Sequence, residues 1–383
     1  HEDAGRDALV ERYKQLYWSG VSQAPAAGTG SSLNAIDFVE KGYDDPAWDE
    51  LIGQLSYEDM LNLIYNGSYQ TQVLPAINLP ATQEFDGPTG FTKSIVGGAN
   101  GMAFTSEDVM AATYNRELIQ EVGKCMGEDM LHAQSGDNAA AVAGIYAPGV
   151  NIHRSPYLGR HNEYYSEDGV LSGSMAANAT IGAEKYGVYA YIKHFALNDQ
   201  ETNRCGMLCT WTNEQAMREI YLKPFEISVK EGKAKAVMSS FNYIGPRWAG
   251  GTYELQTQVL RNEWGFQGMV LTDYFGVYGY MSADQGIRTG TDFCLVAYPT
   301  ETSQTRFRET PAAQQAMRQS TKNILYVTVN SRQYSELGIQ QSTAPNRWET
   351  YLTIANVAVG VVLVAAEAFF IYSFLKKKKN VAA

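Results

Sequence analysis

Residues 268–276 read GMVLTDYFG, a short run of small and apolar residues that leads into Thr272 and Asp273. Such a run is typical of a buried strand, yet a carboxylate almost never lies fully buried unless another group pairs with it or uses it. Three other stretches have the same construction, with apolar residues first and polar residues last: GIYAPGVNIHR (144–154), VYAYIKHFALND (188–199) and AKAVMSSFNYIG (234–245).

The segments between these runs indicate the fold class. Residues 212–232 and 252–265 are amphipathic, and residues 48–67 have the apolar spacing of a helix that Gly67 closes. Strands that alternate with helices along most of the chain predict an α/β fold with a parallel sheet. We therefore expect a (β/α)8 TIM-like barrel, followed by a single C-terminal transmembrane helix.

The polar residues that end the apolar runs predict where a functional site lies. Arg154, Lys193, His194, Asn242 and Asp273 each follow the apolar part of a run. The carboxyl-terminal ends of the strands of a β/α barrel meet at the active site. We therefore expect these side chains to converge in one pocket, with Asp273 at the rim of the barrel and not inside its core.

The charge of the chain excludes one class of partner. The 383 residues carry a net charge of −11, and 45% of them are hydrophobic, as in an ordinary globular protein. Residues 376–379 are four lysines, so the rest of the chain holds 26 basic and 41 acidic residues. Without a basic stripe on so acidic a body, nucleic acid is not an expected partner.

The cysteines predict neither a metal site nor a definite redox state. They are Cys125, Cys205, Cys209 and Cys294, and the sequence shows no second ligand pair at a spacing that zinc would need. Cys205 and Cys209 are close enough in sequence for a small-loop disulfide in an oxidising compartment. Two free thiols fit the sequence equally well. No cofactor is expected.

Residues 351–375, YLTIANVAVGVVLVAAEAFFIYSFL, contain a single charged residue, Glu367. A bilayer core needs about 20 apolar residues in a helix, so this segment is long enough to span it. A buried core helix is the alternative, but such a helix rarely carries so long an apolar run directly before four lysines. Glu367 is costly inside a membrane unless it is protonated or paired, and it indicates a contact with another helix.

The flanks of this segment predict its orientation. Trp348 and Tyr351 on one side and Tyr372 on the other lie where interfacial aromatic residues are common. Lysines beside a span stay in the cytoplasm, so the N-terminal body is expected outside it. The chain begins HEDAGRD, without an initiator Met or a signal sequence, and we expect a processed or excised start.

These features divide the chain into five expected parts. They are an N-terminal segment or linker (1–48), a barrel (49–335), a juxtamembrane linker (336–350), a transmembrane helix (351–375) and a basic cytoplasmic tail (376–383).

Four motifs resemble glycoside hydrolase family 3, the β-glucosidase-like enzymes, and occur in the order found in that family. They are FDGPTG (85–90), HRSPYLGRHNEYYSED (153–168), KHFALNDQETNR (193–204) and GMVLTDYFG (268–276). The similarity covers about residues 50–335 and implies a retaining hydrolase of terminal β-linked sugars. Its substrate would be a β-glucoside or a related oligosaccharide. A retaining glycosidase needs an ionised carboxylate as its nucleophile, and the resemblance assigns this role to Asp273.

The resemblance also implies the residues that bind the sugar. Asp86 matches the acidic residue that accepts hydrogen bonds from sugar hydroxyls, and Arg154, Lys193 and His194 match positions that hold other hydroxyls. Lys and Arg would also favour the ionised form of Asp273. Adjacent residues point to opposite faces of a regular strand, so Lys193 and His194 can both reach the sugar only at a strand end or a bulge.

The resemblance assigns the role of general acid to no residue of this chain. Retaining hydrolysis needs an acid about 5–5.5 Å from the nucleophile. In β-glucosidase-like members that Glu comes from a second α/β sandwich domain, which precedes the barrel in a permuted subset. The N-acetylglucosaminidase branch instead uses a His in a KHFPGHG-like loop, and KHFALNDQET lacks it. Glu201 is expected to be structural, and Glu163 to pair with Arg160.

Two further expectations follow. Phe241 stands where many family members have a Tyr that bonds the nucleophile, so the pKa of Asp273 should be raised unless Asn242 or Tyr243 substitutes. With the acid/base Glu expected on an upstream domain, the alternative function is a non-catalytic, membrane-anchored sugar-binding protein on the same barrel.

Overall fold

The computed structural model describes residues 21–92, 101–133, 141–275, 280–296, 310–334 and 347–381. The chain forms two compact units, residues 1–339 and residues 340–383, and each is described by itself. The expected juxtamembrane linker 336–350 falls largely outside the described residues. Residues 1–20 of the expected N-terminal segment 1–48 also lie outside them.

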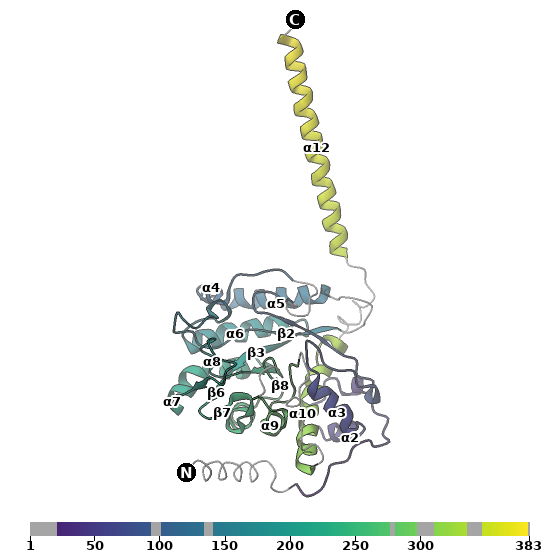
Figure 1. Ribbon diagram of the computed structural model, residues 1–383. Coiled ribbons are helices and arrows are strands. Elements are labelled where there is room, and N and C mark those ends of the chain that lie inside the picture. The colour runs from purple at the N-terminus through teal and green to yellow at the C-terminus, as the bar shows by residue number, and fades with distance from the viewer. Residues whose placement is uncertain are drawn as a thin grey trace. The chain divides into compact units, whose positions relative to one another are not determined.

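A five-stranded parallel sheet forms the centre of the first unit (Figure 1). Its strands lie in the order β1-β2-β3-β5-β8, so each strand pairs with the next one of the sheet along the chain. The prediction of an α/β fold with a parallel sheet is confirmed. The bounds of these strands are β1 Gln83–Asp86, β2 Val142–Tyr146, β3 Tyr189–Phe195, β5 Ala236–Ser239 and β8 Met269–Leu271.

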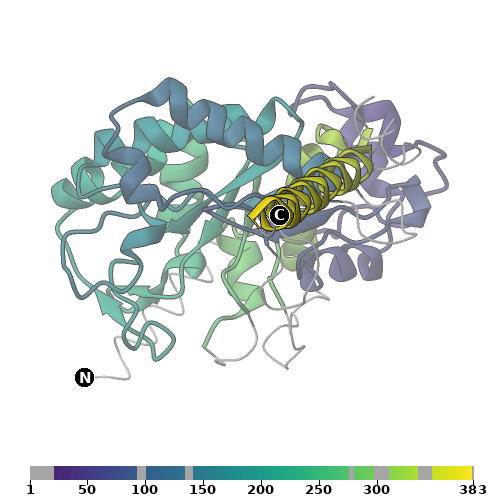
Figure 2. The same cartoon turned by 90° about the horizontal axis from the view of Figure 1, so that it is seen from above.

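The strands are apolar because they are covered on both sides. All residues of β2, β3, β5 and β8 are buried, as is usual when helices cover a parallel sheet. Helices α5 (Arg116–His132), α6 (Gly169–Glu184) and α8 (Lys223–Lys230) pack in series beside the sheet. Figure 2 shows the N-terminal helices, in purple, beside α10 (Pro311–Val329), which contacts α3 (Tyr57–Tyr65).

The segments predicted as helices divide into shorter elements. Residues 48–67 form α2 (Ala47–Gly53) and α3, because Ser56 begins a new helix: its hydroxyl accepts from Asp59 N at 3.1 Å, and Asp59 Oδ2 accepts from Ser56 N at 2.9 Å. The other α-helices that the structure describes in the first unit are α4 Glu107–Ala111, α7 Glu214–Ala216 and α9 Ala283–Thr289. Two π-helices are η4 Met217–Tyr221 and η6 Glu254–Glu263. The 3₁₀-helices are η1 Ala35–Phe38, η2 Pro75–Ile77, η3 His161–Glu163, η5 Ala249–Gly251 and η8 Arg332–Tyr334.

Two further segments extend the hydrogen bonding past the edge strands. Beyond β8, Phe293 bridges to Leu271 in parallel. Cys294 N in turn donates to Ile64 O at 2.8 Å, and Gly67 N donates to Cys294 O at 3.1 Å. At the opposite edge, Glu84 N of β1 donates to Tyr69 O at 2.9 Å. Residues 64–69 therefore hydrogen-bond on one side to the neighbour of β8 and on the other to β1.

A small three-stranded sheet lies apart from the main one. It contains β4 (Cys209–Thr210), β6 (Tyr243–Ile244) and β7 (Arg247–Trp248), with β6 in the middle. All four cysteines are free thiols in the structure, so the second of the two alternatives for Cys205 and Cys209 applies here.

The second unit contains one long helix, α12 (Arg347–Val381). Its segment Tyr351–Tyr372 has a mean hydropathy of 2.3 and no buried residues. By length and composition it is long and apolar enough to cross a membrane.

Candidate active site

Asp273 lies two residues after β8, at the carboxyl-terminal end of the sheet. Its backbone N donates to Ser239 O of β5 at 3.0 Å, and its Oδ1 accepts from Tyr274 N at 2.7 Å. The residue is 8% exposed, and no group in the described part of the chain hydrogen-bonds its Oδ2. One carboxylate oxygen is thus fixed by the backbone, while the other is buried and has no hydrogen bond from the described residues.

Two side chains face that second oxygen. His194 Nε2 lies 3.6 Å from Oδ2, and Arg204 Nη1 lies 3.5 Å from it. Burial raises the pKa of Asp273 above its ordinary value, while Arg204, Arg160 and Lys193 oppose this change. The structure therefore brings together Asp273 and His194 of the predicted set, beside an arginine that the prediction omitted.

His194 is a neutral imidazole. Burial lowers its pKa well below the ordinary value, and Arg160, Lys193 and Arg204 lower it further. Asn198 Nδ2 donates to the Tyr164 hydroxyl at 2.9 Å, and that hydroxyl lies 3.0 Å from His194 Nδ1. Because the Tyr164 hydroxyl oxygen accepts a hydrogen bond from Asn198, the hydroxyl can donate its own hydrogen to His194 Nδ1. The imidazole proton then lies on Nε2, toward Asp273.

Lys193 belongs to a chain of ion pairs behind Asp273. Its Nζ lies 2.5 Å from Glu163 Oε1, Arg160 Nε lies 2.5 Å from Glu163 Oε2, and Arg160 Nη1 lies 3.2 Å from Glu201 Oε1. Arg204 Nε closes the chain at 2.7 Å from Glu201 Oε2. With Asp273 ionised, three cations face three anions, so the partly buried cluster is neutral.

These contacts limit what the two glutamates can do. Burial by itself would raise the pKa of Glu163, but Lys193 and Arg160 outweigh it and the pKa is lowered. Glu201 contacts two guanidinium groups, those of Arg160 and Arg204. The lowered pKa makes Glu163 a poor proton donor, and the ion pairs of both glutamates agree with the structural roles expected for them.

The register of β3 is irregular where Lys193 and His194 make their contacts. Its pairing with β5 shifts between Lys193 and Phe195, which is the irregularity that the sequence required there. His194 faces Asp273, and the preceding Lys193 reaches Glu163. The Arg204 guanidinium lies 4.5 Å from the centre of the Phe241 ring. The aromatic residue expected near the nucleophile therefore supports an arginine instead of donating a hydroxyl.

Asp86 and Arg154 lie in other contacts. Asp86 is the last residue of β1, and its Oδ2 accepts from the Tyr69 hydroxyl at 2.8 Å. Arg154 is exposed; its guanidinium lies over the Tyr221 ring and donates to the Tyr221 hydroxyl. Asn242 Nδ2 donates to Ala196 O at 3.1 Å, so it braces the loop after β3.

Sequence reasoning missed several residues of this region. Arg204, Asn198 and Asp199 all lie within the quoted motif 193–204, so the motif held a signal that could have found them. Burial raises the pKa of Asp199 to about 7, although Arg154 opposes the rise. Tyr69, by contrast, lies in no quoted motif, and only the folded chain places it against Asp86.

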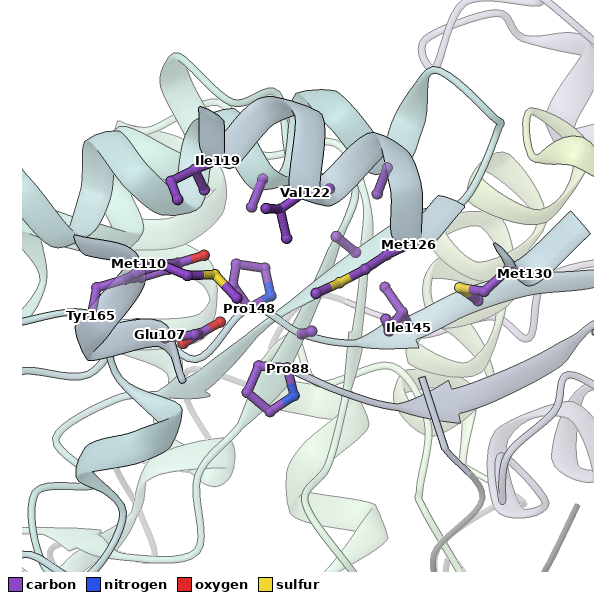
Figure 3. A pocket seen from close by; sticks show the side chains of 15 residues that line it. Pro88, Glu107, Met110, Ile119, Val122, Met126, Met130, Ile145, Pro148 and Tyr165 are labelled. Atoms are coloured by element: carbon purple, nitrogen blue, oxygen red, sulfur yellow. The ribbon is translucent and has the colours of Figure 1, made fainter. Parts of the chain in front are cut away.

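A separate cavity of about 20 Å³ lies between α5 and β2, and Figure 3 shows its lining. The lining is mostly apolar, including Met110, Ile119 and Ile145, and Glu107 is its one carboxylate. Burial raises the pKa of Glu107 well above its ordinary value. The volume holds about one water molecule, so this cavity is no sugar site. No group of three or more His, Cys, Asp or Glu side chains among the described residues could hold a metal ion.

Comparison with known proteins gives one family. The model of the glycosyl hydrolase family 3 N-terminal domain matches residues 51–310. A β-glucosidase of Ruminococcus albus is 34% identical over 290 residues, which are 72% of this chain and 29% of the relative. A β-glucosidase of Rhizobium radiobacter is 36% identical over 247 residues, 64% of this chain and 29% of the relative. The chain thus spans less than a third of the length of these relatives.

Solved structures agree with the sequence comparison. The β-glucosidase 3B of Thermotoga neapolitana in complex with glucose has a TM-score of 0.66 at 32% identity, over 80% of this chain and 46% of that one. A β-glucosidase of Paenibacillus barengoltzii has a TM-score of 0.71 at 28% identity, over 86% of this chain and 37% of that one. On its motifs, its parallel sheet and these matches, the chain belongs to glycosyl hydrolase family 3.

Proposed function

We propose that this chain carries the nucleophile-bearing barrel of a retaining glycoside hydrolase that cleaves terminal β-linked sugars, with a β-glucoside or related oligosaccharide as substrate. The observation that carries the proposal is the position of Asp273 at the end of β8, with Oδ2 between His194 and Arg204 and without a hydrogen bond from the described residues. The relatives and the glucose-bound neighbour are named β-glucosidases, which supports the same class.

In the proposed first step, Asp273 Oδ2 attacks the anomeric carbon and forms an ester. The bond from that carbon to the leaving oxygen breaks, and its electron pair goes to the oxygen, which needs a proton. Arg204 favours the ionised form of the nucleophile, and His194 Nε2–H, 3.6 Å from Asp273 Oδ2, would donate to a sugar hydroxyl oxygen. Asp86, Lys193 and Arg154 would hold other hydroxyls.

Asp86 and Asp273 lie at opposite edges of the five-stranded sheet, so a shared pocket requires the sheet to curve round. We propose that it closes into a barrel through residues 64–69, which hydrogen-bond both to Cys294 beside β8 and to Glu84 of β1. In this arrangement the ends of β1 and β8 approach each other across the rim. The barrel would occupy residues 49–335.

The general acid is proposed to lie on an α/β sandwich domain outside this chain. Lys193 and Arg160 lower the pKa of Glu163, so it is not suited to give up a proton, and Glu201 is held in ion pairs with Arg160 and Arg204. Water attack on the glycosyl-enzyme needs a general base, and the same domain would supply it.

We propose further that α12 anchors the barrel to a membrane. The apolar segment Tyr351–Tyr372 is followed by Lys376–Lys379, which would keep the C-terminal tail in the cytoplasm and the barrel outside it. A second candidate function, sugar binding without hydrolysis, is favoured by one observation: Glu163 and Glu201, the two glutamates of the cluster beside Asp273, are both held in ion pairs.

Substrates with different leaving groups test the function. On the full chain, dinitrophenyl β-glucoside should react and release dinitrophenol, because this leaving group needs little protonation, whereas cellobiose should react about 10²–10⁴-fold more slowly. Asp273→Asn should abolish both reactions. Binding of glucose without release of dinitrophenol would favour the binding protein. Fast turnover of cellobiose would show an acid within the chain, with Asp199 the first residue to replace.

A further inference from the structure

Two carboxylates of β1 share one face of the strand. Glu84 and Asp86 are two residues apart, and alternate residues of a strand point to the same side. Glu84 is fully buried, while Asp86 at the strand end is half-buried. The strand thus carries one carboxylate inside the core and a second one at the rim, where Asp86 is proposed to meet the sugar.

Three tyrosines of the neighbouring strands hold the inner carboxylate. Glu84 Oε2 accepts from the Tyr146 hydroxyl at 2.7 Å, and Oε1 accepts from those of Tyr189 at 2.9 Å and Tyr191 at 2.6 Å. Burial raises the pKa of Glu84 to about 7, and the hydrogen bonds from these three hydroxyls oppose the rise. Glu84 therefore fixes the hydroxyl of Tyr146, which lies opposite Asp86 in the β1–β2 pairing.

Tyr69 connects this fixed cluster to Asp86. Its backbone N donates to the Tyr146 hydroxyl oxygen at 3.1 Å, and its carbonyl accepts from Glu84 N at 2.9 Å. Its own hydroxyl donates to Asp86 Oδ2 at 2.8 Å, and its ring lies 5.4 Å from that of Tyr146. Both backbone polar groups of Tyr69 are therefore bound to the inner cluster, and its side chain reaches the outer carboxylate.

The backbone of Tyr69 is in an uncommon conformation. Its φ is +54°, in the left-handed region that a bulky residue rarely adopts. Such a conformation persists where the surroundings determine it, and it is common at functional sites. Tyr69 is only 5% exposed, so its ring is held in place by packing as well. The backbone strain and the two backbone hydrogen bonds together aim the phenol at Asp86.

We propose that Tyr69 is a positioning residue, which orients the Asp86 carboxylate so that its remaining lone pairs accept hydrogen bonds from sugar hydroxyls. The inference rests on the proposed role of Asp86 in sugar binding. An ionised carboxylate has about four acceptor positions in its plane. A donor on Oδ2 fixes the rotation of that plane, which otherwise has a broad torsional minimum. Loss of the Tyr69 hydroxyl would leave the charge of Asp86 intact but not its orientation.

Two matched variants of the full chain separate positioning from stability. Tyr69→Phe removes the hydroxyl that reaches Asp86, while Tyr189→Phe removes a hydroxyl of the same kind from Glu84 and leaves the contact of Tyr69 with Asp86 in place. Both should fold, as judged by circular dichroism and thermal melting. On dinitrophenyl β-glucoside, Tyr69→Phe should lower kcat/KM by about tenfold or more, the size of a hydrogen bond to a charged group, and Tyr189→Phe by less than about twofold.

Deoxygenated substrates give the decisive readout. The substrates are dinitrophenyl β-glucosides that each lack one hydroxyl, at C3, C4 or C6. If Asp86 binds the missing hydroxyl, Asp86→Ala should not lower kcat/KM on that analogue, and this identifies the hydroxyl. On that analogue the loss caused by Tyr69→Phe should disappear, and the double variant should lose no more than Asp86→Ala. Equal losses on every analogue, or an equal loss in Tyr189→Phe, would overturn the positioning role.

The hydrolase proposal can be wrong while Tyr69 still orients Asp86, and the experiments distinguish these two outcomes. If the wild-type chain releases no dinitrophenol, the hydrolase proposal fails, and the same variants are then compared by calorimetric binding of glucose and its deoxy analogues. Weaker binding in Tyr69→Phe that the matching deoxy sugar cancels supports the inference. Identical glucose binding by wild type and Tyr69→Phe, or no glucose binding by wild type, contradicts it.

Discussion

At the scale of single residues, the ionisation of Asp273 controls the proposed reaction. Burial raises its pKa above the ordinary value of 3.8, and Arg204 works against this rise. Because the carboxylate must be ionised to attack, the acid limb of kcat/KM for dinitrophenyl β-glucoside should lie above pH 3.8. Replacing Arg204 by Met removes a lowering cation and should move the limb to higher pH.

Arg218→Met is the matched control for this pH profile. Arg218 pairs with Glu214 and Glu263 on the exposed surface, and its loss should leave the acid limb unchanged. An acid limb that stays in place in Arg204→Met, or that moves equally in both variants, would mean that Arg204 does not set the ionisation of Asp273.

Asp86 should act mainly in the transition state. Contacts to sugar hydroxyls tighten as the ring distorts, so Asp86→Ala should lower kcat more than it raises KM. Steady-state kinetics with dinitrophenyl β-glucoside measure both parameters. A rise in KM alone, with kcat unchanged, would mean that Asp86 binds the substrate and the transition state equally well and would contradict this prediction.

The residues of the site differ in how far sequence could predict them. Asp273 and His194 follow apolar runs, so strand-end reasoning and family motifs both led to them, and the structure places them 3.6 Å apart. Arg204 reaches Asp273 from a loop, and Tyr69 reaches Asp86 from a residue with positive φ. Neither position has a periodic signal, because long-range packing and not local pattern brings each side chain to its partner.

At the scale of elements, the contact of α5 with α6 depends on glycines. A Cβ at Gly123 would lie 2.1 Å from Ala179 O, a backbone atom that cannot move aside cheaply. Gly123→Ala should therefore destabilise the chain by roughly 1–3 kcal/mol through overpacking. Gly30→Ala is the control, since nothing lies within 4 Å of its Cβ position. Urea unfolding compares them, and equal midpoints would show that the helices do not pack this closely.

The strands were easier to predict from sequence than the helices. Each of the four quoted runs overlaps a strand of the sheet, because strands covered on both faces are continuously apolar. Residues 48–67 carry one apolar periodicity but form two helices, since the Ser56 cap begins a new one. The short strand β1 (Gln83–Asp86) was not predicted from the sequence, because two of its four residues are acidic and do not form an apolar run. In the folded chain, tyrosine hydroxyls donate to both of these carboxylates.

At the scale of the whole molecule, the apolar helix α12 predicts a topology. Protease added to intact cells or right-side-out vesicles should digest the first unit and spare the tail from Lys376 onward, because lysines beside a span stay in the cytoplasm. Immunoblotting with epitope tags at the two ends measures this. Cleavage of the lysine tail before the barrel would reverse the orientation, and release of the intact chain by alkaline carbonate would show that α12 does not span.

The central claim is that Asp273 is the nucleophile, and trapping the covalent intermediate tests it most directly. The full chain would be treated with 2,4-dinitrophenyl 2-deoxy-2-fluoro-β-glucoside, whose fluorine slows breakdown of the ester, then digested and sequenced by mass spectrometry. One fluoroglucosyl group is expected, on the Asp273 carboxylate, and none in Asp273→Asn. A label on any other residue, or unchanged labelling in Asp273→Asn, would contradict it.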